Sequence, residues 1–460
     1  MTKYRTEKDS LGDVQVPANA YWGAQTQRAV NNFPISGQPL PPAFIHAVAR
    51  IKRCAARVNA DLGDLSEDKR AAIVGACNAI TDGEQDEQFP VDVFQTGSGT
   101  STNMNVNEVV AHLCVEAGVE VHANDDVNMG QSSNDVIPTA IHVSGVQQVS
   151  HQLMPAVEKL IHALGRRARA LDDTVKTGRT HLMDAMPITL EQELQTWVLQ
   201  LQHALEQLEQ ARMGLLSIPQ GGTAVGTGIN AHPEFARRFA ETLAEDTDQP
   251  FRPLELPFAG QSGVDRPLGL SAALRGLATV LMKIANDLRW MNSGPIHGLA
   301  EITLPALQPG SSIMPGKVNP VIPESSAMVA AQVMGLDQSN TVAAQSGNFQ
   351  LNVMLPLLAN NLLTMIDLLA NSCAVMADKA IDDFTVNTDH LADGVGRNPV
   401  LVTALNPVIG YEKAAAVAKK AYAQGRAIID VAEEDTELAR DELERILDPS
   451  KLAHPHRDND

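Results

Sequence analysis

Apolar residues recur at helical spacing over most of the chain beyond about residue 135. The clearest run covers residues 187–216. Its apolar positions are Leu190, Leu194, Trp197, Leu201, Leu205 and Leu208. Intervals of three and four place these side chains on one face of a helix. Similar segments cover residues 135–171, 269–290, 323–340 and 352–380. Helices of this length predict a mainly α fold built on a helical bundle, and argue against a doubly wound sheet.

The rhythm of the pattern differs at the two ends of the chain. In the first 130 residues, short helical stretches such as residues 43–60 alternate with loops rich in Gly, Pro and Asn. Beyond about residue 391, Gly and Asn-Pro steps interrupt the pattern every few residues. We therefore expect a mixed, mostly helical N-terminal domain (1–130), a central long-helix bundle (131–390) and a small C-terminal helical domain (391–460). The apolar stripes of the central helices are broad, so we expect other subunits to cover part of them.

Composition narrows the range of partners. Only 4% of the residues are aromatic, which favours helices packed through aliphatic side chains. The formal net charge of −20 makes nucleic acid and anionic membranes poor partners, so any site for an anionic substrate must be a local cluster of donors. No signal peptide or membrane-length apolar run is evident. The four cysteines are far apart in sequence, which predicts free thiols in a reducing cytoplasm.

Small hydroxyl, amide and glycine residues gather in four loops. These loops are Thr96-Gly-Ser-Gly-Thr100 with Thr102 and Asn103 after it, Gly130-Gln-Ser-Ser-Asn-Asp135, Gly178-Arg-Thr-His181 and Gly310-Ser-Ser-Ile-Met-Pro-Gly-Lys-Val-Asn-Pro320. The second and third loops lead into predicted helices, whose N-termini favour anions. Donors from four converging loops would suit a small dicarboxylate. Each loop taken alone is ordinary turn and cap chemistry, His181 alone could be a capping residue, and Lys317 alone would usually be a solvated charge.

Two cofactor motifs fail on inspection. The Gly310–Lys317 string has five residues between its glycines, and Val318 stands where a P-loop needs Ser or Thr. The glycines at 221–228 follow a predicted helix, whereas the dinucleotide fingerprint follows a strand. No metal-ligand spacing is present in the sequence. We therefore expect acid–base chemistry with no cofactor and no metal.

The 310–320 string resembles the signature loop of the fumarase/aspartase superfamily. The resemblance extends from Asp9-Ser-Leu-Gly to Gly410-Tyr-Glu-Lys413, essentially the whole chain. Three positions look like those of class II fumarases: Ser98 where aspartate ammonia-lyases typically have alanine, His181 where they usually have glutamine, and Gly316 where they often have alanine. The segments 320–324 and 351–356 look more like ammonia-lyases.

This resemblance implies a fold, an activity and an assembly. The fold would be the three-domain fumarase/aspartase arrangement, whose long helices assemble into the helical core of a homotetramer. The activity would be the reversible anti addition of water to fumarate, which gives (S)-malate through an aci-carboxylate in the tricarboxylic acid cycle. Loops from three different subunits would build each active site.

The resemblance also assigns roles to residues. Ser311 would be the base acting on C3 of malate, with Lys317 helping to hold it near its alkoxide form. His181 would handle the water or hydroxide, and Glu324 would partner this histidine. The substrate-binding residues would be Ser98, Gly99, Thr100, Asn103, Ser132, Ser133, Asn134, Thr180, Ser312, Lys317, Val318 and Asn319. A peripheral anion site would comprise His122, Ala123, Asn124 and Asp125, although Ala123 replaces a proline and no basic residue precedes His122.

Two other functions remain open at this point. Aspartate ammonia-lyase shares the aci-carboxylate step but eliminates ammonia, and the residues at 321–324 fit it. A non-catalytic structural protein recruited from a lyase is the other, although Ser311, His181, Lys317 and Glu324 are all in place.

Overall fold

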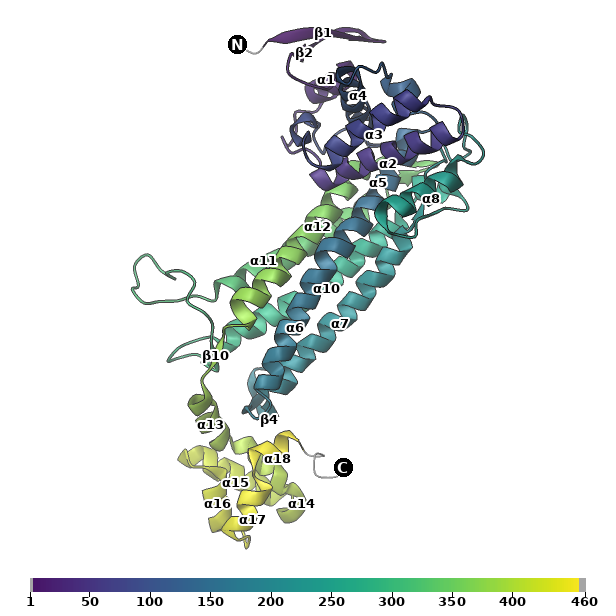
Figure 1. The fold of residues 1–460 in the computed structure, drawn as a ribbon. Coiled ribbons are helices and arrows are strands. Elements are labelled where there is room, and N and C mark those ends of the chain that lie inside the picture. The colour runs from purple at the N-terminus through teal and green to yellow at the C-terminus, as the bar shows by residue number, and fades with distance from the viewer. Residues whose placement is uncertain (1–2, 455–460) are drawn as a thin grey trace. The chain divides into compact units, whose positions relative to one another are not determined.

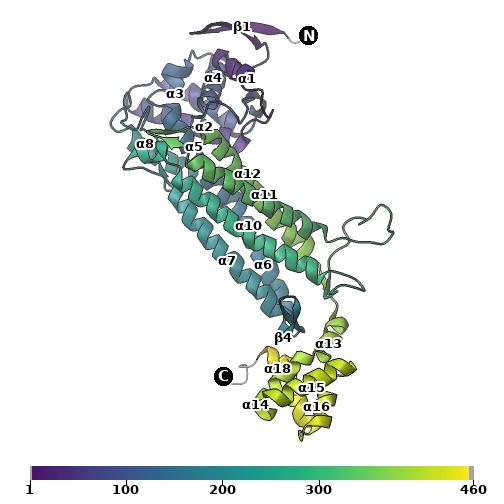
Figure 2. The same cartoon turned by 180° about the vertical axis from the view of Figure 1, so that it is seen from behind.

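The computed structural model describes residues 3–454 and is mainly helical (Figures 1 and 2). The helices are α1 (Ala24–Asn32), α2 (Pro42–Asp61), α3 (Glu67–Thr81), η1 (Asp86–Gln88), α4 (Thr100–Glu116), η2 (Ala123–Val127), α5 (Ser133–Gln148), η3 (Val149–Leu153), α6 (Met154–Ala170), α7 (Leu190–Leu215), α8 (Phe235–Thr247), α9 (Pro257–Ser262), α10 (Asp265–Met291), α11 (Val321–Ala344), α12 (Leu355–Met376), η4 (Ala377–Ile381), α13 (Thr388–Gly396), η5 (Pro399–Leu405), α14 (Asn406–Ile409), α15 (Tyr411–Gln424), α16 (Ile428–Asp435), α17 (Arg440–Ile446) and α18 (Pro449–Ala453).

The strands are short and pair two by two. They are β1 (Tyr4–Asp9) with β2 (Gly12–Pro17), β3 (Val175–Thr180) with β4 (Met183–Thr189), β5 (Ser217–Ile218) with β6 (Arg252–Pro253), β7 (Ile302–Thr303) with β10 (Thr385–Val386), and β8 (Gly347–Asn348) with β9 (Leu351–Asn352). Every pair except β5–β6 is antiparallel. The predicted mainly α fold is therefore confirmed.

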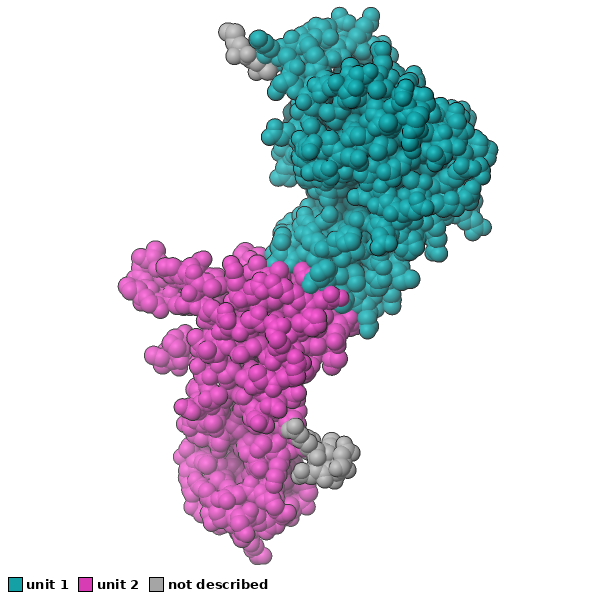
Figure 3. All heavy atoms as spheres, viewed as in Figure 1, with its two compact units in different colours: residues 1–155, 204–278, 329–371 teal, residues 156–203, 279–328, 372–460 magenta. Residues whose placement is uncertain are grey.

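The chain divides into two compact units, which Figure 3 colours separately. Unit 1 contains residues 1–155, 204–278 and 329–371, and unit 2 contains residues 156–203, 279–328 and 372–460. The helices α6, α7, α10, α11 and α12 each contribute residues to both units. The expected division at residues 130 and 390 stays a prediction, because units defined by contacts do not test it.

The predicted long helices are present, with two starts corrected. The helix expected from residue 352 begins at Leu355, because residues 351–352 form β9. The helix expected to begin at Pro187 begins at Leu190, because residues 183–189 form β4 and Pro187 pairs with Thr177 of β3. Thr189 and Gln192 then cap the helix reciprocally: the backbone N–H of Gln192 donates to Thr189 Oγ1 (3.2 Å), and that of Thr189 donates to Gln192 Oε1 (3.0 Å).

The long helices bury polar side chains between them in addition to leucines. Within unit 1, the Ser271 hydroxyl of α10 donates to Asp337 Oδ1 of α11 at 2.7 Å, and Asn340 Nδ2 donates to the same hydroxyl at 3.0 Å. All three side chains are buried. Satisfied polar contacts of this kind fix which helix faces meet, since any other register would leave them unpaired.

Two helical segments, Asp265–Met291 and Leu355–Ile381, are long and apolar enough to cross a membrane by length and composition alone. The expectation that no apolar run reaches membrane length is therefore wrong by these two criteria. Buried core positions such as Leu274, Leu281, Leu362 and Ile366 lie on them. The core helices of a water-soluble protein have the same composition, so the segments carry little weight as membrane spans.

The cysteines match the expectation of free thiols. Cys54, Cys77, Cys114 and Cys373 are all buried and unbridged. Burial raises the pKa of Cys54, Cys114 and Cys373 to about 12, and it raises the pKa of Cys77 as well. These thiols therefore act as small apolar side chains at neutral pH.

A buried charge cluster in unit 2 holds the β3–β4 hairpin, which carries Thr180 and His181 at its turn. Glu301, only 1% exposed, lies within 2.7 Å of Lys176 Nζ and 2.5 Å of Arg179 NH1, both from β3. Lys176 also contacts Glu193 of α7 at 2.5 Å. Glu301 directly precedes β7, so the cluster connects the predicted catalytic hairpin to that strand.

We expect Glu301→Gln to lower the free energy of unfolding by about 3 kcal/mol, because a buried ion pair that loses one partner leaves charge uncompensated. Urea unfolding followed by circular dichroism measures the change. Asp184→Asn is the matched control, since Asp184 lies on the same hairpin but is exposed. Equal urea midpoints for the two variants would contradict a role for Glu301 in holding the hairpin.

Candidate active site

The loop at residues 310–320 closes on itself through its two ends. The backbone N–H of Gly310 donates to the carbonyl oxygen of Lys317 (2.8 Å), and Asn319 Nδ2 donates to the carbonyl oxygen of Gly310 (2.8 Å). A Cβ atom at position 310 would lie 2.5 Å from that Lys317 oxygen, so only glycine permits the closure. The sequence 311–316 is thereby presented as one exposed turn.

Ser311 lies at the start of this turn with its oxygen inside a backbone nest. Its Oγ accepts N–H bonds from Ile313 (3.2 Å) and Met314 (3.0 Å). Hydrogen bonds to an oxygen favour its anionic form over its protonated form. Two amides at this oxygen would favour an alkoxide there, alongside the predicted help from Lys317, and the role of Ser311 as a base stays a prediction.

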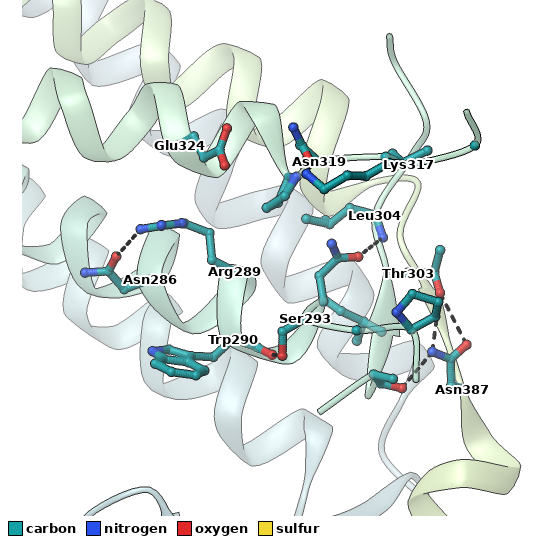
Figure 4. A pocket seen from close by; sticks show the side chains of 18 residues that line it. Asn286, Arg289, Trp290, Ser293, Thr303, Leu304, Lys317, Asn319, Glu324 and Asn387 are labelled. Atoms are coloured by element: carbon teal, nitrogen blue, oxygen red, sulfur yellow. Dashed lines mark hydrogen bonds between the residues drawn. The ribbon is translucent and has the colours of Figure 1, made fainter. Parts of the chain in front are cut away.

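Lys317 and Asn319 lie on the wall of a pocket of about 640 Å³ in unit 2 (Figure 4). Lys317 Nζ donates to Asn319 Oδ1 at 2.5 Å. Arg289 of α10 and Glu324 of α11 add a second cation and a carboxylate to the same wall. Arg289 donates to Asn286 Oδ1 at 3.1 Å. The pocket thus combines two cationic side chains and amide groups, which suit carboxylate binding, with one carboxylate of its own.

Thr180 and His181 lie at the tip of the β3–β4 hairpin. His181 and Leu182 both have positive φ angles (55° and 60°), and the His181 side chain is exposed. Non-glycine residues in this region carry strain that the surrounding structure must hold, and such strain is frequent at functional sites. Among residues 3–454, no hydrogen bond joins His181 to Glu324. Their partnership therefore stays a prediction.

In unit 1, the loop before α4 is shaped by two glycines. Gly99 has φ 73°, and a Cβ atom there would lie 2.8 Å from the Ile137 side chain. Gly97 approaches the Val353 carbonyl so closely that a Cβ atom would overlap it. The loop presents Ser98 and Thr100, whose hydroxyls are 2.8 Å apart.

The 130–135 loop ends in the N-cap of α5. Ser132 and Asp135 form a capping box, and Asp135 Oδ2 also accepts the backbone N–H groups of Gly221 (3.0 Å) and Thr223 (2.9 Å). Burial raises the pKa of Asp135 to about 6, although these N–H groups oppose the rise.

The residues after this cap include two further predicted ligands. Asn103 Nδ2 donates to Ser133 Oγ at 3.0 Å, which joins the two donor loops of unit 1. Asn134 Nδ2 donates to the carbonyl oxygen of Ala224 at 2.8 Å. Ser98, Gly99, Thr100, Asn103 and Ser132 to Asn134 therefore form one donor-rich region within unit 1.

The predicted peripheral site lies at η2. The backbone N–H of His122 donates to Asp126 Oδ2 (2.8 Å), and that of Asp125 donates to His122 Nδ1 (3.1 Å). Both the His122 and Asp125 side chains are mostly exposed. The geometry provides a local turn with two nearby carboxylates, and anion binding here stays a prediction.

Sequence reasoning missed several residues that support the site. Lys176, Arg179 and Glu301 were not singled out, because the odd spacing of the two cations does not follow strand alternation and the register irregularity between Thr177 and Arg179 is not visible in the sequence. Arg289 lies in the last turn of α10, where a basic residue is common, so nothing in the sequence distinguished this arginine. Lys52 occupies the apolar face of α2, and that mismatch with the hydrophobic pattern could have drawn attention to it.

Comparison with known proteins gives a consistent result over the full chain. The lyase family pattern matches residues 12–335, and the fumarase C C-terminus pattern matches residues 401–454. A Pseudomonas aeruginosa protein named fumarate hydratase class II 2 is 56% identical over 98% of this chain and 99% of its own. A Mycobacterium tuberculosis protein named fumarate hydratase class II is 48% identical over 98% of this chain and 96% of its own.

Solved structures agree with these sequence relatives. The class II fumarase of Schistosoma mansoni superposes with a TM-score of 0.96 at 38% identity, covering 99% of this chain and 100% of that one. A fumarate lyase:delta crystallin from Brucella melitensis bound to cobalt gives 0.94 at 42% identity, covering 98% and 100%. With the 310–320 loop, the donor loops of unit 1 and the hairpin of His181 all in place, the chain belongs to the class II fumarase family.

Proposed function

We propose that this chain is a fumarate hydratase, which adds water to fumarate to give malate and runs the reverse reaction. The observation that carries the proposal is full-length similarity to relatives named fumarate hydratase class II, with the Ser311 loop and His181 retained. The alternative of an aspartate ammonia-lyase is disfavoured by His181 and Ser98, two of the three positions at which the chain resembles fumarases.

The mechanism that fits these residues is a stepwise anti addition. When malate is dehydrated, Ser311 Oγ removes the proton from C3. The two backbone N–H groups that bond this oxygen stabilise the negative charge it must carry beforehand. The electrons move to the neighbouring carboxylate and form an aci-carboxylate that carries two negative charges. His181 then protonates the departing hydroxide, which leaves as water and gives fumarate.

Stabilising the doubly charged end is the larger energetic task. Positioned acid–base groups contribute about 10²–10⁴-fold, whereas enzymes typically reach roughly 10⁶-fold or more. Preorganised donors must supply the remainder. Lys317 and Asn319, already hydrogen-bonded to one another, are suited to bind this carboxylate.

We expect Lys317→Ala to lower kcat by about 10²–10³-fold, which is the usual effect of removing one preorganised donor from a developing oxyanion. The loss is measured as the rate of fumarate formation from malate in the ultraviolet. Lys419→Ala is the control, because Lys419 is exposed on α15 far along the chain from the site loops. Turnover near the wild-type value in the Lys317 variant, with the protein folded, would remove this residue from the mechanism.

The substrate itself is tested by offering malate and aspartate in parallel to the wild-type protein. We expect fumarate to accumulate with malate and not with aspartate. Activity on aspartate alone would reassign the chain to the ammonia-lyases. A folded protein inactive on both would favour the structural-protein alternative.

A homotetramer with shared active sites completes the proposal. The site loops and long helices expose large apolar side chains in the single chain, including Leu182, Met183, Ile313, Met328 and Phe349. Exposed apolar surface of this kind is typical of protein–protein contacts. We place the enzyme in the cytoplasm, a location supported by its four unbridged cysteines.

Shared sites predict complementation between inactive chains. Ser311→Ala and His181→Asn chains should each be inactive as pure assemblies. Co-expressed, they should regain part of the wild-type activity, because some sites then combine an intact Ser311 with an intact His181 from another chain. Sedimentation of the wild type as a tetramer is the accompanying measurement. A monomer, or mixed assemblies as inactive as the pure ones, would refute the shared site.

A further inference from the structure

A buried lysine lies beneath the donor loops of unit 1, and the mechanism above does not use it. Lys52, on α2, is 0% exposed. Its Nζ donates to Asn128 Oδ1 (2.8 Å) and to Gln131 Oε1 (3.0 Å). Among residues 3–454 no carboxylate lies within ion-pair distance of it. Burying an ammonium against amides alone is costly, so the position calls for an explanation beyond packing.

One partner of Lys52 connects it to the predicted ligands of α4 and α5. Asn128 Oδ1 also accepts N–H bonds from Asn103 (3.2 Å) and Asn107 (3.3 Å). Asn103 in turn donates to Ser133 Oγ at 3.0 Å. A continuous chain of hydrogen bonds therefore runs from the buried lysine through Asn128 to the two side chains that join the donor loops.

The other partner connects Lys52 to the start of the 131–134 segment. Gln131 directly precedes Ser132, and its Nε2 donates to the carbonyl oxygens of Val127 and Met129, both at 3.1 Å. Asn128 Nδ2 donates to the carbonyl oxygen of Gln131 at 3.2 Å. With Lys52 on its oxygen, the Gln131 side chain is fixed from both ends, and so is the backbone that leads into the donors.

Lys52 can make both of its hydrogen bonds whether its amine is charged or neutral. Burial lowers the pKa of Lys52 to about 7, and the carboxylate of Asp135 on α5 and the thiol of Cys77 on α3 act against that shift. A neutral amine still has two N–H groups, one for Asn128 and one for Gln131.

Two acidic side chains near α2 have cations other than Lys52 as partners. In η2, Asp126 is bonded to Lys69 (2.7 Å). In α8, Asp246 is bonded to Arg50 and Arg53 of α2 itself, both at 2.6 Å. From α4, the groups that face this network are the uncharged Asn103 and Asn107. Among the charged side chains of residues 3–454, Lys52 alone is hydrogen-bonded to Asn128 and Gln131, whose other partners are neutral.

We propose that Lys52 is a positioning residue for substrate binding: through Asn128 and Gln131 it holds Asn103 and the Ser132–Asn134 donors in the arrangement that receives a dicarboxylate. The inference rests on the proposed hydratase function. Because Lys52 is fully buried, we expect it to act through these amides and not by touching the substrate.

The test is Lys52→Met, which removes the N–H donors and keeps most of the side-chain volume. We expect KM for malate to rise by about tenfold to a hundredfold, the cost of misplacing groups that hold a substrate, with a smaller effect on kcat. A purely structural role would lower the fraction of active enzyme, and hence the apparent kcat, at unchanged KM.

Two further variants separate positioning from stability. Ile51→Ala truncates a fully buried neighbour on α2 outside the hydrogen-bond network, and it should lower the melting temperature at unchanged KM. Asn128→Ala should raise KM as Lys52→Met does, and it carries the test alone if the lysine variant does not fold. In the double variant the two effects on KM should coincide instead of multiplying, since both act through one path.

The outcomes are distinguishable. An unchanged KM in folded Lys52→Met, or in Asn128→Ala if only that variant folds, would overturn the inference, and so would multiplying effects in the double variant. Absence of malate activity in the wild type would instead refute the proposed function, on which the inference depends.

Discussion

A strongly negative chain must bind a dianion and then stabilise still more charge on it. With a net charge of −20, the protein as a whole repels such a substrate, so attraction has to come from short-range contacts at fixed positions. Backbone amides, hydroxyls and amide side chains act at this range but only when they are held in place. The arrangement of loops, caps and buried charges in this fold is best understood as the means of holding them.

Buried charged residues do much of this holding, and they do so without facing the substrate. Asp135 gathers three backbone N–H groups from two segments, Glu301 anchors the hairpin of His181, and Lys52 orients two amide side chains. Each is expensive to bury and therefore specifies one arrangement of its neighbours over others. The glycines at 97, 99 and 310 complement them, because they allow backbone to approach where a side chain would intervene.

Much of this could be predicted from the sequence, and the limits have physical causes. The helical periodicity predicted the long helices, since burial of one face imposes a repeat of 3.6 residues that is visible in any single chain. The start of α7 was predicted three residues too early. Residues 183–189 are extended because they pair with β3, and hydrophobic periodicity does not reveal strand pairing. The 310–320 string predicted the site loop, but the two amides on Ser311 Oγ are backbone groups and leave no trace in the sequence. The partnership of His181 and Glu324 comes from the resemblance alone, because no hydrogen bond within residues 3–454 joins the two side chains, and it stays a prediction.

The four buried thiols have a practical consequence. Because burial raises their pKa values so far, almost none is present as the reactive thiolate at neutral pH. They are distributed over α2, α3, α4 and α12, so an alkylating reagent can reach each one only when its own helix separates from the core. Mass spectrometry of the alkylated peptides would then give the opening rate of each of these helices in the native enzyme, with no label introduced by mutation.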